Sequence, residues 1–194
     1  RKLPYSLNRC LEYADTEYVA RMDGDDISKP ERFEKEITFL DRHQEYTIVS
    51  TAMEYFDENG LFKIGQPVEQ PSKINFIGST PHAHAPAMIR TSVIVSVGGY
   101  TDKRWTRRGQ DVHLWAKIYS NGNIGYNLSE PLYMMRDDIS AYKRRSVKEA
   151  VFAVRRNYEI YKLMNISYLN VYGLIRPLLV ALLPKFIYDK VHRQ

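Results

Sequence analysis

Tyr18-Val19-Ala20-Arg21-Met22-Asp23-Gly24-Asp25-Asp26 is the stretch of sequence that decides the fold. Its first residues are mostly apolar, aromatic or β-branched, so we expect a short buried strand that is covered on both faces. Three carboxylates follow at once, and Gly24 lets the chain turn between them. In open α/β sheets, ligands bind just beyond the carboxyl ends of the strands. The stretch therefore predicts a strand that brings acidic side chains to one edge of a sheet.

Two interpretations of the acidic cluster are open at this point. Asp23 and Asp25 are two residues apart, so they point to the same side of an extended chain. Their hard oxygens suit Mg²⁺ or Mn²⁺, especially an ion that is shared with phosphate groups. Aspartate and glycine are also common in surface turns for purely conformational reasons. The spacing alone does not separate a metal site from a turn.

Composition places the chain among ordinary globular proteins. Its 194 residues are 44% hydrophobic and 26% charged, which suits one domain with or without an extension. The net charge of +5 is compatible with phosphate-bearing ligands or an anionic membrane surface, and we expect no nucleic-acid partner. The single cysteine, Cys10, excludes an intrachain disulfide framework and favours the cytoplasm. We see no signal peptide and no apolar run of transmembrane length. The chain begins at Arg1 within a helical pattern, so we expect a fragment or a missing start.

Hydrophobic periodicity predicts helices and strands that alternate along the chain. From about residue 141 the pattern is only helical, so we expect one domain over 1–140 and a helical C-terminal extension over 141–194. The expected elements are a helix from Leu3 to Ala14, the strand at Tyr18, a helix ending near His43, strands at Tyr46–Phe56 and Leu61–Ile64 joined by a turn at Asp57–Gly60, a short helix capped by Ser72, a strand at Ala87–Arg90, a helical turn at Thr91–Val97, a helix from Asp111, one or two short strands within Ile124–Met135, and a long helix from Ser146 to Met164.

Asp111 opens the helix that follows the basic loop Trp105–Gly109. Aspartate at this place is either an N-cap or a general base, a carboxylate that takes a proton from an attacking hydroxyl. Because a helix N-terminus stabilises negative charge, we expect a lowered pKa and an ionised Asp111 at neutral pH. His82 and His84 could bind zinc, but no cysteine or further histidine lies near them in the sequence. Pocket lining or simple strand structure is the favoured interpretation for both.

In this order, the segments resemble the inverting nucleotide-sugar glycosyltransferases of family 2, which have the GT-A fold. The residues that carry the resemblance are Leu7-Asn8-Arg9 with Leu11-Glu12-Tyr13-Ala14, Met22-Asp23-Gly24-Asp25-Asp26 with Pro30-Glu31-Arg32-Phe33, His84-Ala85-Pro86-Ala87-Met88-Ile89-Arg90, Gly98-Gly99-Tyr100, and Asp111-Val112-His113-Leu114-Trp115. The similarity covers about residues 3 to 136. It implies an α/β fold with a Rossmann-like mixed sheet flanked by helices, from which the family's N-terminal strands are missing. Those strands normally hold the nucleotide base, so the resemblance does not identify the donor.

The resemblance also implies roles for individual residues. Asp25, with Asp23, would hold Mg²⁺ or Mn²⁺ against the diphosphate of a nucleotide-sugar donor, and Asp111 would deprotonate the acceptor hydroxyl. Residues expected on the acceptor side or in support of the site are Asp26, which would order the turn, His84, Gln110 and Trp115. Gln110 replaces the glutamate that the family usually has before the base.

The acceptor implied by the resemblance is a saccharide or a lipid-linked saccharide, in the synthesis of surface polysaccharide or glycolipid. The QxxRW motif of processive members is missing, which favours single additions. Two alternatives stay open from the sequence. One is a catalytically inactive GT-A module that binds or scaffolds, and the other is a metal-dependent phosphoryl transferase, which also uses clustered carboxylates.

The C-terminal segment predicts a peripheral contact with the inner face of a membrane. Its apolar residues are Leu174, Ile175, Leu178, Leu179, Val180, Leu182 and Leu183, and its cations are Arg176, Lys185, Lys190 and Arg193. We expect Pro177 and Pro184 to break the segment, which is too short to span a bilayer. The alternative is that the leucines pack on the domain or on a second subunit of a homo-oligomer.

Overall fold

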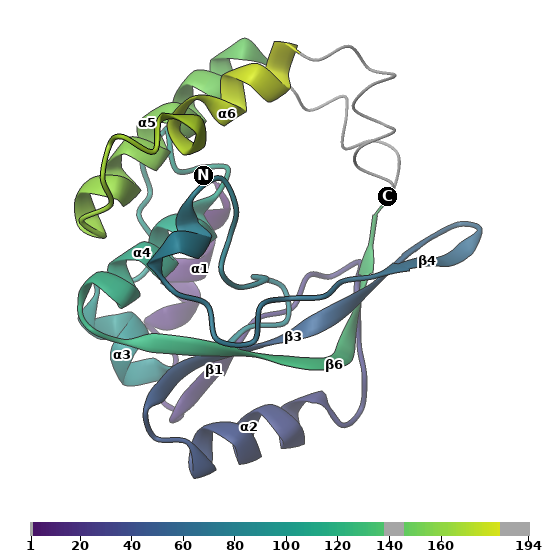
Figure 1. Cartoon of the computed structure of the whole chain (residues 1–194). Coiled ribbons are helices and arrows are strands. Elements are labelled where there is room, and N and C mark those ends of the chain that lie inside the picture. The colour runs from purple at the N-terminus through teal and green to yellow at the C-terminus, as the bar shows by residue number, and fades with distance from the viewer. Residues whose placement is uncertain (1, 138–145, 183–194) are drawn as a thin grey trace.

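The computed structural model describes residues 2–137 and 146–182 (Figure 1). It has a mixed sheet with the strand order β1-β5-β3-β6-β2, and β4 pairs with β3 outside this path. The elements are α1 (Leu3–Leu11), β1 (Tyr18–Ala20), β2 (Ile27–Ser28), α2 (Arg32–Arg42), β3 (Tyr46–Asp57), β4 (Gly60–Ile64), the 3₁₀ helix η1 (Lys73–Phe76), β5 (Met88–Arg90), α3 (Thr91–Ser96), α4 (Gln110–Ser120), β6 (Ile124–Arg136), α5 (Val147–Leu163) and α6 (Val171–Leu182). The predicted α/β class, with a mixed sheet flanked by helices, is confirmed.

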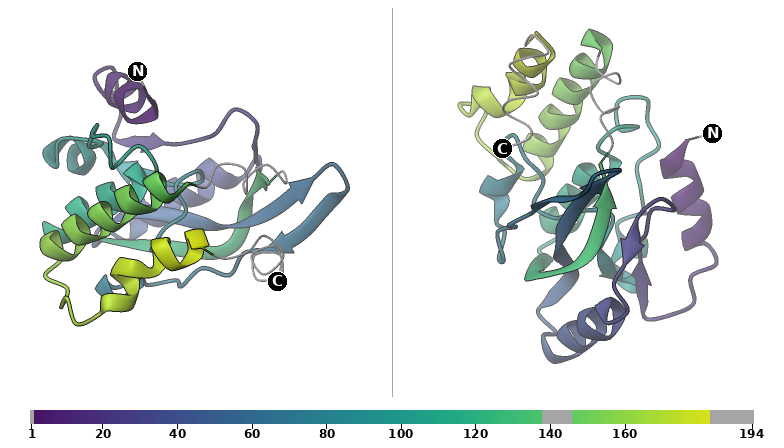
Figure 2. Two further views of the ribbon diagram at one scale, coloured as in Figure 1. Left: turned by 90° about the horizontal axis from the view of Figure 1, so that it is seen from above. Right: turned by 90° about the vertical axis from the view of Figure 1, so that its right-hand side faces the viewer.

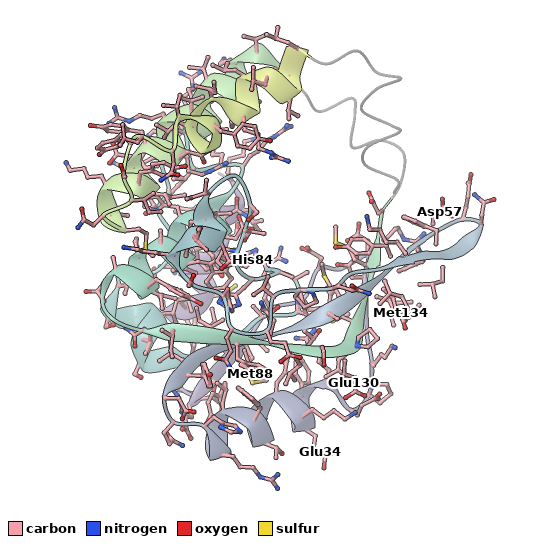
Figure 3. All side chains as sticks on the ribbon, viewed as in Figure 1. Glu34, Asp57, His84, Met88, Glu130 and Met134 are labelled. Carbon is pink, nitrogen blue, oxygen red and sulfur yellow. The ribbon has the colours of Figure 1, made fainter. Side chains whose placement is uncertain are left out.

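Helices cover both faces of the sheet because side chains alternate along its central strands. On β3, Ile48 packs into the larger core and the next residue, Val49, packs into the smaller one. On β5, Ile89 and Met88 divide between the two cores in the same way. The smaller core lies on the side of α2, and Figure 3 shows Met88 pointing toward that helix, with His84 on the opposite side of the sheet.

The larger core continues from the sheet into the C-terminal helices. It contains Trp115 from α4, Ile160 and Tyr161 from α5, and Ile166 after α5. In Figure 1 and in the right-hand view of Figure 2, the α5–α6 pair lies on the side of the sheet opposite to α2. The predicted boundary near residue 140 stays a prediction about folding units, since helices on both sides of it contribute to one core.

Local sequence signals placed several elements correctly. The helix predicted from Ser146 to Met164 is α5, with Ser146 as the N-cap that accepts a hydrogen bond from the Glu149 backbone N–H. The turn predicted at Asp57–Gly60 joins β3 to β4, and both strands project from the body of the sheet (Figure 1). The region predicted as one or two short strands is a single long strand, β6.

Two expectations about exposure and helix breaking were wrong. The strand at Tyr18 is not buried on both faces, because β1 lies at an end of the strand order, Ala20 is exposed and Met22 is 48% exposed. Pro177 lies within α6 and does not end it. Leu183, Pro184 and the cations that follow them lie outside the described residues. Within the described ranges, none of the helices has both the length and the hydropathy that a bilayer crossing needs.

Candidate active site

Strand directions bring the predicted site residues to one edge of the sheet. β5 runs antiparallel to both β1 and β3, and β3 runs parallel to β6, so β1, β3 and β6 all point the same way. The acidic turn, residues Asp23–Asp26 shortly after β1, therefore lies at the same edge of the sheet as the end of β6 and the segment before β5. The Arg21 backbone N–H extends the pairing by donating to the Ala87 carbonyl at 2.9 Å. His84 belongs to that segment before β5.

The three carboxylates of the acidic turn have different surroundings. Arg21 donates two hydrogen bonds to Asp23, at 2.8 and 2.5 Å, in a fork-to-fork arrangement. Asp26 is 9% exposed and accepts hydrogen bonds from the Tyr133 hydroxyl at 2.9 Å and from the Arg136 backbone N–H at 2.8 Å. Asp25 is exposed, and its carboxylate has no hydrogen-bond or ionic partner within the described part of the chain. Asp26 thus ties the turn to β6, while Asp25 faces solvent.

Tyr133 is the residue that links the two ends of the acidic turn. It is fully buried on β6, and its hydroxyl accepts a hydrogen bond from the Asp23 backbone N–H at 3.0 Å while it donates to Asp26. Burial raises the pKa of Tyr133 far above its ordinary value, so the hydroxyl keeps its proton. The guanidinium of the fully buried Arg32 lies 5.1 Å from the centre of the Tyr133 ring. The turn is held by side chains from β6 and α2.

The carboxylates suit a divalent ion that is shared with a ligand. Asp25 offers exposed hard oxygens, and the Asp23 oxygens are already engaged with Arg21. Across residues 2–137 and 146–182, no three acidic, histidine or cysteine side chains are grouped closely enough to hold an ion by themselves. Phosphate and water oxygens would have to complete the coordination, which is how proteins commonly bind Mg²⁺.

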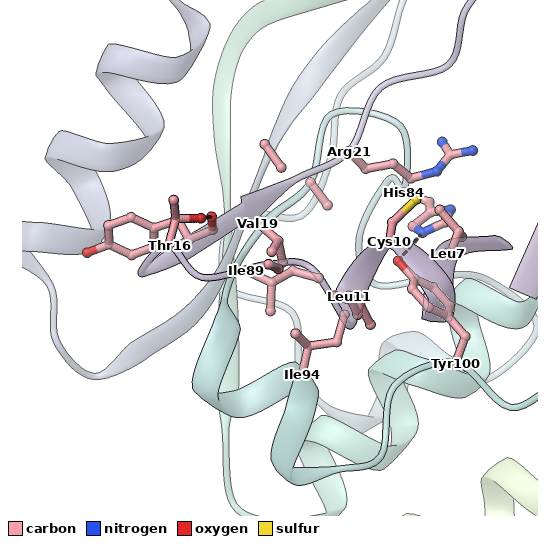
Figure 4. A pocket seen from close by; sticks show the side chains of 14 residues that line it. Leu7, Cys10, Leu11, Thr16, Val19, Arg21, His84, Ile89, Ile94 and Tyr100 are labelled. Atoms are coloured by element: carbon pink, nitrogen blue, oxygen red, sulfur yellow. Dashed lines mark hydrogen bonds between the residues drawn. The ribbon is translucent and has the colours of Figure 1, made fainter. Parts of the chain in front are cut away.

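A pocket of about 310 Å³ opens beside the acidic turn. Most of its wall is apolar and comes from α1, β1, β5 and α3, with Val19, Ile89 and Ile94 among the lining residues. Figure 4 shows Arg21, His84 and Tyr100 together at one end of it. The Tyr100 hydroxyl and His84 Nε2 are 2.8 Å apart and hydrogen-bonded. Burial first, and then the charge of Arg21, lower the pKa of His84 to about 3, so its ring is neutral.

Asp111 is the second residue of α4, not its N-cap, which is Gly109. Arg21 and Arg156 both act electrostatically on its carboxylate, and Asp111 in turn acts on Tyr100. The expected lowering of its pKa was wrong. Burial raises the pKa of Asp111, and this outweighs the opposing hydrogen bond from the Val112 backbone N–H and the two arginines. A carboxylate with a raised pKa is a stronger base than one with an ordinary pKa.

Three other predicted residues are buried. Trp115 is fully buried, and its ring lies 5.9 Å from that of His84, so it supports the histidine and cannot contact an acceptor. Gln110 is 8% exposed at the start of α4. Both ring nitrogens of His82 are used, by Asn127 at 2.7 Å and by Tyr119 at 2.8 Å. This explains His82 as part of a buried polar network.

Four residues at the site have roles that sequence reasoning did not identify: Arg21, Tyr100, Tyr133 and Arg156. Arg21 and Tyr100 stand within the quoted motifs, so their positions were a usable signal. Tyr133 is more than a hundred residues from Asp23 and reaches it through strand pairing. Arg156 is 45 residues from Asp111 and reaches the start of α4 through helix packing. No local pattern marks such contacts.

Comparison with known proteins agrees with this geometry. The sequence model of glycosyl transferase family 2 matches residues 1–91. The Bacillus subtilis (strain 168) protein EpsE, named as a glycosyltransferase, is 35% identical over 196 residues, which cover 100% of this chain and 70% of EpsE. The UDP-Gal:alpha-D-GlcNAc-diphosphoundecaprenol beta-1,3-galactosyltransferase of Escherichia coli is 30% identical over 206 residues, which cover 99% of this chain and 70% of that protein.

Solved structures share the fold. Staphylococcus aureus TarS 1–349 in complex with UDP-GlcNAc matches with a TM-score of 0.59 at 18% identity, over 88% of this chain and 50% of TarS 1–349. The mannosyltransferase PcManGT of Pyrobaculum calidifontis, in complex with GDP-Man and Mn²⁺, matches with a TM-score of 0.52 at 15% identity, over 99% of this chain and 58% of that structure. The chain thus spans about half the length of these solved structures. On its identity to the curated relatives and their coverage, it belongs to glycosyl transferase family 2 and has the GT-A fold.

Proposed function

We propose that this chain carries the catalytic centre of an inverting glycosyltransferase, which moves a sugar from a nucleoside diphosphate sugar to an acceptor hydroxyl. The main support is one arrangement of charges at the sheet edge. Arg21 links the acidic turn Asp23–Asp26 to Asp111, because it hydrogen-bonds Asp23 and acts electrostatically on Asp111. The UDP-galactose and GDP-mannose in the names of related proteins support the donor class.

In the proposed reaction, Asp111 is the general base. Its carboxylate accepts the proton of the acceptor hydroxyl, and the hydroxyl oxygen forms a bond to the anomeric carbon on the face opposite to the diphosphate. The bond between that carbon and the diphosphate oxygen breaks, and the nucleoside diphosphate leaves with the bonding electrons. Because attack and departure use opposite faces, the configuration at the anomeric carbon inverts.

Mg²⁺ or Mn²⁺ is the proposed cofactor, with Asp25 as the main protein ligand and Asp23 as the second. When bound, the ion would offset the negative charge that grows on the departing diphosphate. The exposed carboxylate of Asp25 and the Mn²⁺ in the PcManGT structure support this proposal. Arg21 would keep Asp23 oriented through its two hydrogen bonds.

The test is the Asp111→Asn variant, with Asp102→Asn as the control for an exposed carboxylate on the preceding loop. Purified proteins are incubated with a panel of nucleotide sugars and with lipid-linked or free saccharide acceptors. Release of nucleoside diphosphate and the anomeric configuration of the product are measured by NMR. We expect Asp111→Asn to retain donor binding and to lose about 10²–10⁴-fold in transfer rate, while Asp102→Asn matches the parent.

Other outcomes of this assay would point to the alternatives. Transfer by Asp111→Asn within a few-fold of the parent would reject the general base. Release of sugar 1-phosphate or inorganic phosphate without a glycosylated product would favour a phosphoryl transferase. Donor binding without transfer to any acceptor would favour an inactive binding or scaffold module.

We further propose that the acceptor is a lipid-linked saccharide and that the protein works as a peripheral protein on the inner face of the cytoplasmic membrane. The outer side of α6 supports this. Leu169 before the helix is 92% exposed, and the exposed side chains that follow at helical spacing are Tyr172, Ile175, Leu179 and Leu182. Exposed Arg176 lies on the same helix, and apolar area beside cations suits an anionic lipid surface. The diphosphoundecaprenol acceptor in the name of the E. coli relative agrees with this proposal.

A further inference from the structure

Arg156 lies on α5 (Val147–Leu163), beyond the motifs within residues 3 to 136, yet its side chain reaches the start of α4. One of its terminal nitrogens donates a hydrogen bond to the Arg108 carbonyl. The guanidinium also fills the place that a side chain at Gly109 would occupy, since a Cβ added there would lie 2.7 Å from Arg156 Cζ. Gly109 is the N-cap of α4 and has φ of 90°, a conformation that favours glycine. The arginine and the glycine therefore fit together directly before Asp111.

The charge of Arg156 has Asp111 as its anionic neighbour. Burial lowers the pKa of Arg156, and the Asp111 carboxylate opposes that change. Its Nε is buried without a hydrogen-bond partner among the described residues. Arg156 as a whole is half-buried, and removing part of a cation from water is unfavourable unless an opposite charge compensates it. The Asp111 carboxylate therefore favours the charged form of Arg156 at this place.

Neighbouring residues on α5 show that this placement is specific to one side chain. Arg155 points outward, with 58% of its side chain exposed, and pairs with Glu159 at 2.6 Å. Asn157 donates a hydrogen bond to the Gly173 carbonyl on α6 at 2.8 Å. Arg155 therefore pairs along α5 with Glu159, Asn157 contacts α6 and accepts a hydrogen bond from Arg156 at 3.3 Å, and Arg156 alone of the three reaches the start of α4.

We propose that Arg156 is a positioning residue for the transfer reaction, which holds the Arg108–Gly109 turn and places a fixed positive charge beside Asp111. The inference rests on the proposed role of Asp111 as the general base. In this proposal α5 contributes a side chain to the active site, and Gly109 is needed because any larger residue would displace the Arg156 guanidinium. The other groups that favour the charged form of Asp111 are Arg21, after β1, and the backbone N–H groups of Asp111 and Val112, and Asp111 in turn acts on Tyr100.

The test compares Arg156→Met with Arg155→Met, which removes an equal charge from the adjacent position. The pKa of the Asp111 carboxyl is measured by ¹³C NMR titration, with its signal assigned from the Asp111→Asn spectrum. Because Arg156 lowers this pKa, we expect it to rise by about 1 in Arg156→Met and to stay within about 0.3 of the parent in Arg155→Met. On the acid side of the kcat profile, turnover by Arg156→Met should fall about 10-fold at a given pH.

Folding of each variant is checked by circular dichroism. If Arg156→Met does not fold, Arg156→Gln replaces it in the same comparison, because its amide still donates to a carbonyl but carries no charge. Equal Asp111 pKa values and equal kcat profiles in the position-155 and position-156 variants would overturn the inference. The Asp111→Asn turnover separates this failure from a failure of the proposed function. A fully active Asp111→Asn protein rejects the base itself, whereas an inactive one leaves the base in place and rejects only the role of Arg156.

Discussion

Replacing Tyr133 by phenylalanine should loosen the acidic turn without changing any carboxylate. The substitution removes one hydroxyl and, with it, two hydrogen bonds: the one donated to Asp26 at 2.9 Å and the one accepted from the Asp23 backbone N–H at 3.0 Å. A hydrogen bond to a charged group contributes about 1.5–3 kcal/mol and a neutral one about 0.5–1.5 kcal/mol. Asp26 keeps the Arg136 backbone N–H, so it retains one partner. We therefore expect the free energy of unfolding to fall by about 3 kcal/mol.

Tyr126→Phe is the matched control because it removes a hydroxyl from the same strand. The Tyr126 hydroxyl donates to Glu69 at 2.8 Å, but this pair lies at the surface, where such bonds contribute little. Urea unfolding followed by circular dichroism gives both free energies. In a chain of this size, a loss of about 3 kcal/mol should lower Tm by roughly 6–12 °C. Equal stabilities of Tyr133→Phe and Tyr126→Phe, to about 0.5 kcal/mol, would show that the Tyr133 hydroxyl does not hold the acidic turn.

Three further perturbations test other parts of the molecule. Asp25→Ala should abolish the Mn²⁺-dependent part of nucleoside diphosphate binding in calorimetric titrations, and unchanged metal dependence would contradict the proposed ligand. The double variant Ile175→Ser, Leu179→Ser should reduce sedimentation with anionic liposomes by about 10-fold or more, whereas Leu61→Ser on β4 should not. Equal binding, or a change in oligomeric mass instead, would favour packing on a second subunit. Burial lowers the pKa of His82 to about 4, so stability is fully present above about pH 6.5 and is lost as the pH falls toward 4. Urea midpoints at pH 7 and 4.5 should differ less in His82→Gln than in the parent, and an equal difference would contradict this.

The sequence predicted the elements whose ends are marked by local chemistry. Ser146 caps α5 as expected, and the turn at Asp57–Gly60 joins the strands that it was expected to join. The exposure of β1 could not be predicted in this way, because a short run of apolar residues has the same sequence pattern in a central strand and in an edge strand. Only the pairing of β1 with β5 in the strand order decides which it is.

Only the part of the candidate site that local motifs mark could be predicted from the sequence. Asp23, Asp25 and Asp111 stand in motifs, so their residue types and order were enough to select them. The pKa of Asp111 was predicted with the wrong sign, since helix position is visible in a sequence but the burial of a carboxyl is not. Tyr133 and Arg156 reach the site from distant positions, and only the fold brings them there.

The shortness of β1 has a consequence for how the protein should respond to its donor. The strand has only three residues and three register partners on β5, yet it carries the acidic turn. Segments with so few backbone pairings open locally at a small fraction of the free energy of global unfolding. Amide hydrogens of Tyr18–Asp26 should therefore exchange with deuterium much faster than those of β3 or β6. A donor that binds the folded turn, and not its locally opened form, stabilises the folded turn by mass action. Donor binding should therefore be measurable as slower deuterium exchange in this one segment.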